Sequence, residues 1–323
     1  MKKVVSFSMG RSSARLVLLA IDKWGVDNVD VVLMDTGAEH PMSYKFAREM
    51  AEHFGINVTC LRGDFSYPLG KGVGFNVVEL SECSHDLKSF KEMMAKYGTP
   101  YIGGMFCTDR MKLQPFKKYC DKTYGKKNYE TILGIRADEP KRLREKPFVS
   151  YLADICDDDK QDILDFWSEQ VFDLEIEEWN GNCVFCPKKS NLKLAAAQRD
   201  NPDLYVKWLD MIKDHPVRRV DSRTINLMKS KGVKEYKLLS EPLSSEKLIN
   251  AARKYNENLF TSKNKKWKSY EDEASLIMYR GNQSLESLIS TFDGSTGNEI
   301  KARIRGGHHT DTNSCSESCE VFS

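Results

Sequence analysis

The chain has 323 residues, of which 40% are hydrophobic and 30% are charged, and its formal net charge is +2. This length is sufficient to bury a full hydrophobic core, and the composition is that of a soluble globular protein. No apolar run approaches the ~20 residues that a membrane-spanning helix requires, and a strand expected at the N-terminus leaves no room for a signal peptide. We therefore expect a cytoplasmic protein without a membrane partner, and the oligomeric state is left open.

The first element expected is a short buried strand over residues 4–7, followed by a hydroxyl-rich turn over residues 8–13 that contains Gly10. A helix is expected from Ser12 onward. A strand that feeds a helix through such a turn directs several backbone N–H groups at one place, where the helix dipole adds positive potential. The pattern predicts an anion site suited to the phosphates of a nucleotide, with an ordinary strand–turn–helix start as the alternative.

Three further apolar runs predict strands, over residues 29–34, 56–61 and 130–135. Helical patterns with short joints separate the strands, and this alternation predicts a parallel sheet with right-handed crossovers. Ligands bind to such sheets beyond the carboxyl ends of the strands. Residues 8–13 and 35–40 both follow such ends, and we expect them to share one pocket.

Residues 7–13, Phe-Ser-Met-Gly-Arg-Ser-Ser, lack both the Rossmann glycine fingerprint and the Walker lysine. They resemble the PP-loop of the adenine nucleotide alpha hydrolases, usually written Ser-Gly-Gly-x-Asp-Ser. The similarity is greatest to the Ser-Gly-Gly-Arg-Thr-Ser variant of phage and bacterial proteins related to phosphoadenylyl sulfate (PAPS) reductase. Met9 stands in place of the first glycine, and Ser12 stands where many members carry aspartate.

Four later segments are similar to motifs of the same family and occur in the family's order. They are Asp-Thr-Gly at 35–37, Cys-Thr-Asp-Arg-Met-Lys at 107–112, Gly-Ile-Arg-Ala-Asp-Glu-Pro at 134–140, and the block from Phe-Asp-Leu at 172–174 to Cys-Val-Phe-Cys-Pro-Lys-Lys-Ser at 183–190. The resemblance covers roughly residues 4–200. It implies a Rossmann-like α/β fold with a parallel sheet. An amphipathic pattern from residue 201 onward predicts a C-terminal helical region in addition.

The resemblance, together with the amphipathic pattern and the composition of the chain after residue 200, suggests three regions. Residues 1–200 would form the PP-loop domain with its Cys-x-x-Cys knuckle, residues 201–292 a helical extension, and residues 293–323 a flexible tail that contains Cys315 and Cys319. Residues 62–106, rich in glycine around one helix at 86–97, would be an insertion that either covers the site as a lid or is a plain surface excursion.

The resemblance also identifies candidate site residues. The expected contacts to an adenine nucleotide, with magnesium as an accompanying ion, are Ser8, Gly10, Arg11, Ser12, Ser13, Asp35, Thr36, Gly37, Gly134 and Arg136. Arg11, Arg136 and Cys319 are the catalytic candidates, and Arg110 and Lys112 are further candidates for phosphate or sulfate contacts. Cys319 is placed by position alone, because the tail lacks the family's Glu-Cys-Gly-Leu-His motif.

The best set of metal ligands is Cys107, Cys183 and Cys186. A Cys-x-x-Cys pair between a glycine and a proline is typical of a metal or cluster site. The resemblance favours a [4Fe–4S] cluster with one open iron. A zinc knuckle completed by another residue and a reduced thiol pair without metal are the alternatives.

The functional expectation is an enzyme of sulfur chemistry that acts on an adenine nucleotide in a bacterium or a phage-infected host. Either PAPS or adenylyl sulfate donates a sulfonate to a thiolate, or ATP adenylates a target that then receives sulfur. A protein that supplies sulfur or thiol reductant would be its partner. Basic runs at 218–223 and 263–268 add nucleic acid as a candidate target. A nucleotide or nucleic-acid-binding accessory protein that has lost catalysis is the non-enzymatic alternative.

Overall fold

The computed structural model describes residues 1–68, 70–100, 105–215, 279 and 284–306. The catalytic candidate Cys319, the predicted tail around it and the basic runs at 218–223 and 263–268 lie outside the described residues. The described chain divides into two compact units. The first comprises residues 1–90 and 107–186, and the second comprises residues 91–106 and the described residues from 187 onward.

The first unit is built on one six-stranded sheet with the strand order β4-β3-β2-β1-β5-β6. The strands are β1 (Lys2–Phe7), β2 (Val29–Met34), β3 (Val58–Asp64), β4 (Gly74–Val78), β5 (Tyr129–Leu133) and β6 (Val149–Tyr151). All neighbouring pairs are parallel except β3 and β4, which form an antiparallel hairpin. The predicted α/β class and parallel sheet are confirmed.

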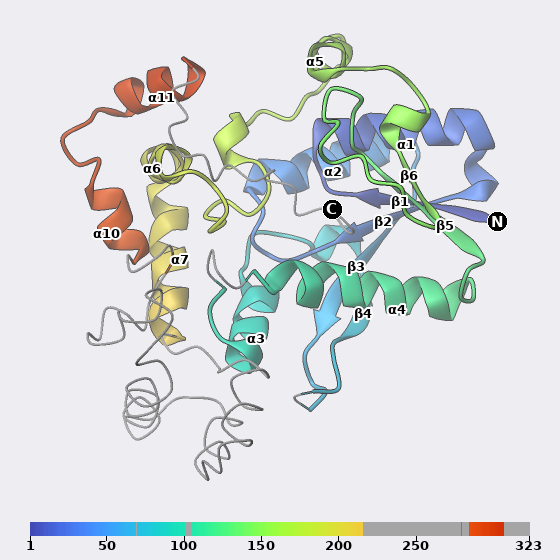
Figure 1. The fold of residues 1–323 in the computed structure, drawn as a ribbon, viewed down its shortest axis with the longest axis horizontal. Helices are drawn as coiled ribbons and strands as arrows, with labels where there is room; N and C mark the ends of the chain where they lie inside the picture. Colours follow the sequence, from blue (N-terminus) through green and yellow to red (C-terminus); the bar gives the residue numbers. More distant parts are fainter. Residues whose placement is uncertain (69, 101–104, 216–278, 280–283, 307–323) are drawn as a thin grey trace, which may run out of the picture. The chain divides into compact units, whose positions relative to one another are not determined.

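Helices cover both faces of this sheet (Figure 1). They are α1 (Arg11–Trp24), α2 (Pro41–His53), α4 (Gln114–Thr123) and α5 (Lys160–Ser168). Alternate residues of β1 serve the two faces: Val5 and Phe7 pack in the cluster that contains α1 and α2, whereas Val4 packs with Phe116 of α4. Two-sided cover explains why the central strands are almost continuously apolar.

Two short strands were not predicted from the sequence. β4 lies at the edge of the sheet, where Val77 is 58% exposed, and β6 has only three residues. Neither therefore shows the apolar run of a central strand. The helix expected after Cys107 begins with one π-helical segment, η3 (Thr108–Leu113), before α4 continues it. The remaining short helices of this unit are η1 (Val26–Asn28), η2 (Leu80–Glu82), η4 (Leu152–Asp154) and η5 (Glu178–Asn180).

The second unit is helical. It contains α6 (Asn191–Asp200), α7 (Pro202–Asp214), α10 (Leu285–Ser290) and α11 (Gly297–Arg305), and α3 (Lys88–Tyr97) begins in the first unit and continues in the second. Lys301 of α11 forms an ion pair with Asp200 at the end of α6. The expected C-terminal helical region is thus present. No helix of the described chain is long and apolar enough to cross a membrane.

Candidate nucleotide site

The candidate site lies at the carboxyl end of β1. β1 has β2 as a neighbour on one side and β5 on the other, so the chain leaves β1 in one direction and later returns to its opposite side. In open α/β sheets such a switch in strand order opens a crevice beyond the strand ends, where ligands bind. The predicted segments 8–13 and 134–139 follow β1 and β5 at this edge.

Ser13 fixes the shape of the loop between β1 and α1. Its Oγ accepts hydrogen bonds from the Ser8 N–H (3.1 Å) and the Ser8 hydroxyl (3.0 Å), and it donates to the Gly10 carbonyl (2.9 Å). Ser13 is only 2% exposed. Gly10 is the N-cap of α1, and glycine has no side chain with which to satisfy the N–H groups of the first turn. These N–H groups of the first turn of α1 can donate hydrogen bonds to a bound anion.

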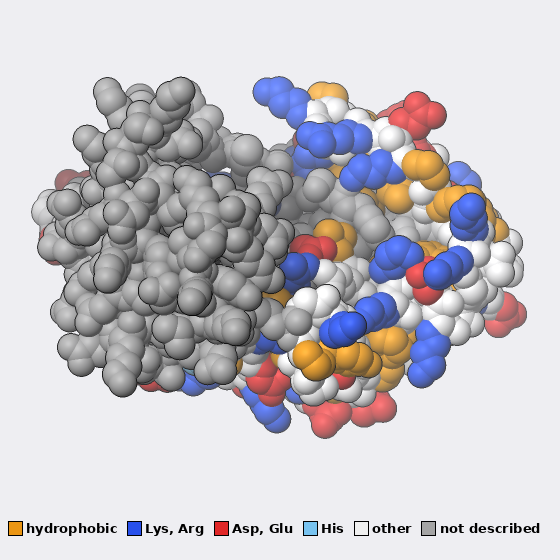
Figure 2. All heavy atoms as spheres, turned by 60° about the horizontal axis from the view of Figure 1, so that its bottom comes forward, with side chains coloured by type: hydrophobic (Ala, Val, Ile, Leu, Met, Phe, Trp, Pro, Cys, Tyr) orange, Lys and Arg blue, Asp and Glu red, His pale blue; other side chains and the backbone are white. Residues whose placement is uncertain are grey.

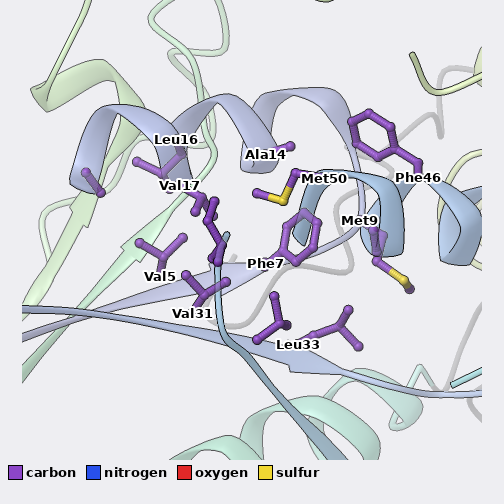
Figure 3. Close-up of a cluster of buried hydrophobic side chains, with 14 of the residues drawn as sticks. Val5, Phe7, Met9, Ala14, Leu16, Val17, Val31, Leu33, Phe46 and Met50 are labelled. Atoms are coloured by element: carbon purple, nitrogen blue, oxygen red, sulfur yellow. The ribbon is translucent and has the colours of Figure 1, made fainter. Parts of the chain in front are cut away.

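Met9 has a left-handed backbone, with φ 61°, at the position where the family carries glycine. A residue with a Cβ is strained in this region by ~1–2 kcal/mol. The side chain of Met9 is 2% exposed and packs in the cluster that contains Phe7 and Phe46, as Figure 3 shows. Burial of the side chain offsets the strain, and the loop keeps the conformation that a glycine would adopt freely.

Arg136 connects the segment after β5 with the start of α1. Its Nη1 donates to Ser12 Oγ (3.2 Å), while its Nε and Nη2 donate to the carboxylate of Asp138 (2.7 and 3.1 Å). The hydrogen bond from Arg136 lowers the pKa of Asp138. Two predicted site residues that are 124 positions apart in the chain thus touch at the carboxyl edge of the sheet.

Gly134 permits this approach. A Cβ at Gly134 would lie 2.8 Å from Ser13 Cα and 2.9 Å from Ser13 N. The glycine therefore allows the end of β5 to reach the backbone of α1, and its contact with a nucleotide stays a prediction.

Arg11 is held by the Phe-Asp-Leu segment. Its Nε and Nη2 donate to the two carboxylate oxygens of Asp173 (2.6 and 2.8 Å), and Nη2 also donates to the Leu174 carbonyl (2.5 Å). The indole of Trp167 donates to the Arg11 carbonyl (3.0 Å). This part of the family pattern had no assigned role in the sequence, and the structure shows that it anchors the first residue of α1.

Asp35 is completely buried below the site. It forms an ion pair with Arg62 Nε (2.7 Å) and accepts hydrogen bonds from the Tyr44 hydroxyl and the Gly37 N–H (both 2.9 Å). Burial and the nearby charge of Glu39 raise the pKa of Asp35, although Arg62 acts in the opposite direction. These contacts make Asp35 a support of the loop after β2, and its contact with a nucleotide stays a prediction.

Glu39 is the centre of a second buried contact set. Its Oε2 accepts from the Thr36 hydroxyl (2.6 Å) and the Tyr44 hydroxyl (3.0 Å), and Oε1 pairs with Lys112 Nζ (3.4 Å). Burial raises the pKa of Glu39, but Lys112, Thr36 and Tyr44 together hold it below its usual range. Lys112 is buried in this pair rather than lying on a solvated helix face.

Glu39, Tyr44 and Arg62 were missed as site residues by sequence reasoning. Charged residues next to apolar strands are the sequence pattern that could have identified Glu39 and Arg62. Glu39 lies in the segment after β2, and Arg62 interrupts the apolar run of β3. A charge in such a place requires a partner of opposite charge.

The Cys-x-x-Cys knuckle lies against the loop that follows β2. Cys183 forms an isolated β-bridge with Glu39, its Sγ is 3.9 Å from Thr36 Oγ1, and the Val184 N–H donates to the Ala38 carbonyl (3.1 Å). Cys183, Cys186 and Cys107 are all buried. Within the described ranges no three His, Cys, Asp or Glu side chains form a group that could hold a metal. The described residues therefore do not complete the predicted cluster site.

Comparison with known proteins agrees with this arrangement. The family model "Phosphoadenosine phosphosulfate reductase domain" matches residues 2–67, which contain β1, β2, β3 and the loop at 8–13. The nin region protein ORF290 of Escherichia phage lambda is 38% identical over 326 aligned residues, which cover all of this chain and 96% of that protein. The chain belongs to the PAPS reductase-like family. Members of this family are enzymes that bind adenine nucleotides.

Two archaeal relatives share only part of their length with this PAPS reductase-like protein. The Methanocaldococcus jannaschii proteins MJ0066 and MJ0973 are 23% and 26% identical over 66% and 64% of the chain. The matched regions are 42% and 47% of those two proteins. The similarity to the lambda protein covers the whole chain and therefore includes the segments at 134–140 and 183–190.

Proposed function

We propose that this protein is a cytoplasmic enzyme of sulfur chemistry that binds an adenine nucleotide at the start of α1. The observation that carries the proposal is the convergence of Ser12 and Arg136 beside the N–H groups of the first helical turn. Backbone donors, a helix dipole and a guanidinium together bind a phosphate or a sulfate well.

Arg136 and Arg11 have different roles in this proposal. Arg136 pairs with Asp138 near the site and would exchange that carboxylate for an oxygen of the ligand. The guanidinium of Arg11 donates hydrogen bonds to Asp173 and to the Leu174 carbonyl, and Arg11 would act as a positioning residue that holds α1 in place. Asp35, Thr36 and Gly37 would shape the pocket from below, while Ser8, Gly10 and Ser13 would shape the phosphate loop.

Transfer of a sulfonate from PAPS or adenylyl sulfate is the first candidate reaction. A thiolate attacks the sulfur, the S–O bond to the nucleotide breaks, and the nucleotide leaves with the electron pair. A second thiol from a reductant then releases sulfite and is oxidised together with the first to a disulfide. The position of the knuckle beside the loop after β2 supports thiol chemistry at this edge, and Cys319 is the nucleophile that we propose for the step.

Adenylation by ATP is the second candidate reaction. An oxygen of the target attacks the α-phosphate, pyrophosphate leaves, and a sulfur donor then displaces AMP from the target. The exposed lysines of α4 favour this version, because they can contact the phosphates of a nucleic-acid target.

A metal at the knuckle is a separate part of the proposal. Cys183 and Cys186 lie on one turn, in which the Cys186 N–H donates to the Cys183 carbonyl (3.2 Å), and this supports a shared ligand. Iron and acid-labile sulfide in protein purified without oxygen, lost in Cys183→Ala, would support the [4Fe–4S] cluster. Zinc in their place would support a structural knuckle. If the protein contains neither iron nor zinc, Cys183 and Cys186 form a thiol pair without metal.

The reaction is tested by incubating the purified full chain separately with ATP and with PAPS and a dithiol reductant. Sulfite released from PAPS, and lost in Cys319→Ser, supports sulfonate transfer. Pyrophosphate and AMP formed from ATP support adenylation. Nucleotide binding without any of these products, with reductant and sulfide present, would contradict the enzymatic proposal and leave the accessory role.

A further inference from the structure

The exposed part of α4 and the turn that follows it have an unusual concentration of lysines. Between residues 117 and 127 there are five exposed lysines, and the one acidic residue in that stretch is Asp121. The lysines are Lys117, Lys118, Lys122, Lys126 and Lys127. Asp121 pairs with Lys117 at 2.6 Å and also accepts from the Tyr129 hydroxyl, so it compensates one of the five charges.

Aromatic rings of the β3–β4 hairpin lie beside these charges. Lys118 Nζ is 4.9 Å from the ring centroid of Tyr67, and Lys122 Nζ is 5.7 Å from that of Phe75. The ring of Phe75 also packs edge-to-face on Tyr119. In the described part of the chain, neither Lys118 nor Lys122 has a carboxylate within ion-pair distance. The two ammonium groups are held in place by rings, and their charge is available to a partner.

The same face also offers apolar surface. Tyr67 is 44% exposed and Val77 is 58% exposed, which is unusual for large hydrophobic side chains of this protein. Figure 2, in which the lower side of Figure 1 is turned toward the viewer, shows Lys and Arg side chains spread over this surface of the first unit with hydrophobic side chains between them.

We propose that the α4–β4 face, defined by Tyr67, Phe75, Lys118 and Lys122, binds single-stranded nucleic acid. Lysines one helical turn apart can contact successive phosphates, and an exposed ring beside them can stack on a base. An exposed aromatic ring adds nothing to the binding of a purely anionic peptide, so the combination favours a strand that carries both phosphates and bases. This inference deepens the second candidate reaction of the proposed function by naming a surface for a nucleic-acid target, and its test does not depend on nucleotide binding at α1.

The test measures binding of a fluorescein-labelled 20-nucleotide mixed-sequence DNA strand to the full chain, without nucleotide, at several salt concentrations. For single strands, each lost phosphate contact reduces the slope of log K against log salt by ~0.7. Lys118→Gln/Lys122→Gln is expected to lower the slope by about 1.4 and to weaken binding about tenfold at low salt. Tyr67→Ala is expected to weaken binding by about tenfold with the slope unchanged.

Lys45→Gln/Lys160→Gln is the matched control, because both lysines are exposed, lie on α2 and α5, and are removed with the same change of net charge. The control is expected to bind as the wild type does. Equal weakening in the control would overturn the proposal, as would unchanged affinity in both α4–β4 variants. Equally strong competition by polyglutamate and by unlabelled DNA would also overturn it, since the face would then recognise negative charge alone. Circular dichroism confirms that each variant is folded.

Discussion

At the scale of single residues, Met9 shows how the phosphate loop tolerates a departure from its family pattern. Its backbone is left-handed, as the family's glycine would be, and its side chain is buried under the loop. The packing of the Met9 side chain therefore compensates for the strain of the Met9 backbone. A buried methionine contributes about 2–5 kcal/mol relative to a truncated side chain, which exceeds the strain of ~1–2 kcal/mol.

Met9→Gly is expected to restore the family's loop and yet destabilise the protein by about 1–3 kcal/mol, because the lost packing exceeds the relieved strain. Nucleotide affinity is expected to be retained, since the backbone keeps its conformation. Chemical denaturation and nucleotide titration measure the two effects. A more stable glycine variant would show that Met9 is not held by its packing.

Glu39 and Lys112 form a buried ion pair that connects the loop after β2 with η3. Glu39→Gln is expected to destabilise the protein by about 3 kcal/mol, because a buried ammonium group loses its countercharge. Glu39→Gln/Lys112→Met removes both charges and is expected to regain part of that loss. Chemical denaturation measures the free energy of unfolding of the two variants and the wild type. A double variant less stable than Glu39→Gln would contradict the role of the pair.

At the scale of elements, the close approach of β5 to α1 builds the site. A Cβ at Gly134 would meet the Ser13 backbone at 2.8 Å, so Gly134→Ala is expected to cost about 2 kcal/mol and to weaken nucleotide binding by moving the start of α1. Gly10→Ala is the control for stability, because its Cβ would meet only Ser8 Oγ at 3.6 Å, an ordinary contact. A loss of about 0.5 kcal/mol is expected there. Equal losses in both variants would refute the packing argument.

β1 and β5 are also joined by a cross-strand pair, Lys3 with Glu130, and the Ser150 hydroxyl of β6 donates to the same carboxylate. Burial raises the pKa of Glu130, but Lys3 and Ser150 hold it below its usual value of 4.5. The pair therefore stabilises the fold above pH 4.5, and this stabilisation is lost as the pH falls through the lowered pKa.

Glu130→Gln is accordingly expected to be less stable than the wild type by about 1 kcal/mol at pH 7, and this difference should shrink below pH 4.5. Chemical denaturation of both proteins between pH 3 and pH 7 measures this difference in the free energy of unfolding. A difference that stays constant over this range would mean that the charge of Glu130 does not contribute.

At the scale of the whole molecule, the sequence predicts the α/β class, the parallel sheet and the order of the segments at its carboxyl edge. These features follow from local patterns: apolar runs such as 29–34 match β2 exactly, and glycine- and hydroxyl-rich turns separate strands from helices. The edge strand β4 lacks such a run because its consecutive residues Asn76 and Val77 are exposed.

The site is less predictable because its contacts join distant segments. Nothing local shows that Arg11 pairs with Asp173, that Lys112 is buried against Glu39, or that Gly134 faces α1. Arg11 and Lys112 were predicted to contact a ligand because they lie in segments that resemble motifs of the family. Only the tertiary arrangement shows that both are paired with carboxylates.

The most direct test of the central claim is calorimetric titration of ATP and of PAPS into the wild type, Gly10→Val and Arg136→Gln. Gly10→Val is expected to abolish binding while the protein stays folded, since its Cβ would have only Ser8 Oγ within 4 Å and its branches would block the N–H groups of α1. Arg136→Gln is expected to weaken binding by about 10- to 100-fold, as the loss of charged hydrogen bonds predicts. Binding of either nucleotide to both variants with the affinity of the wild type would contradict a nucleotide site at the start of α1.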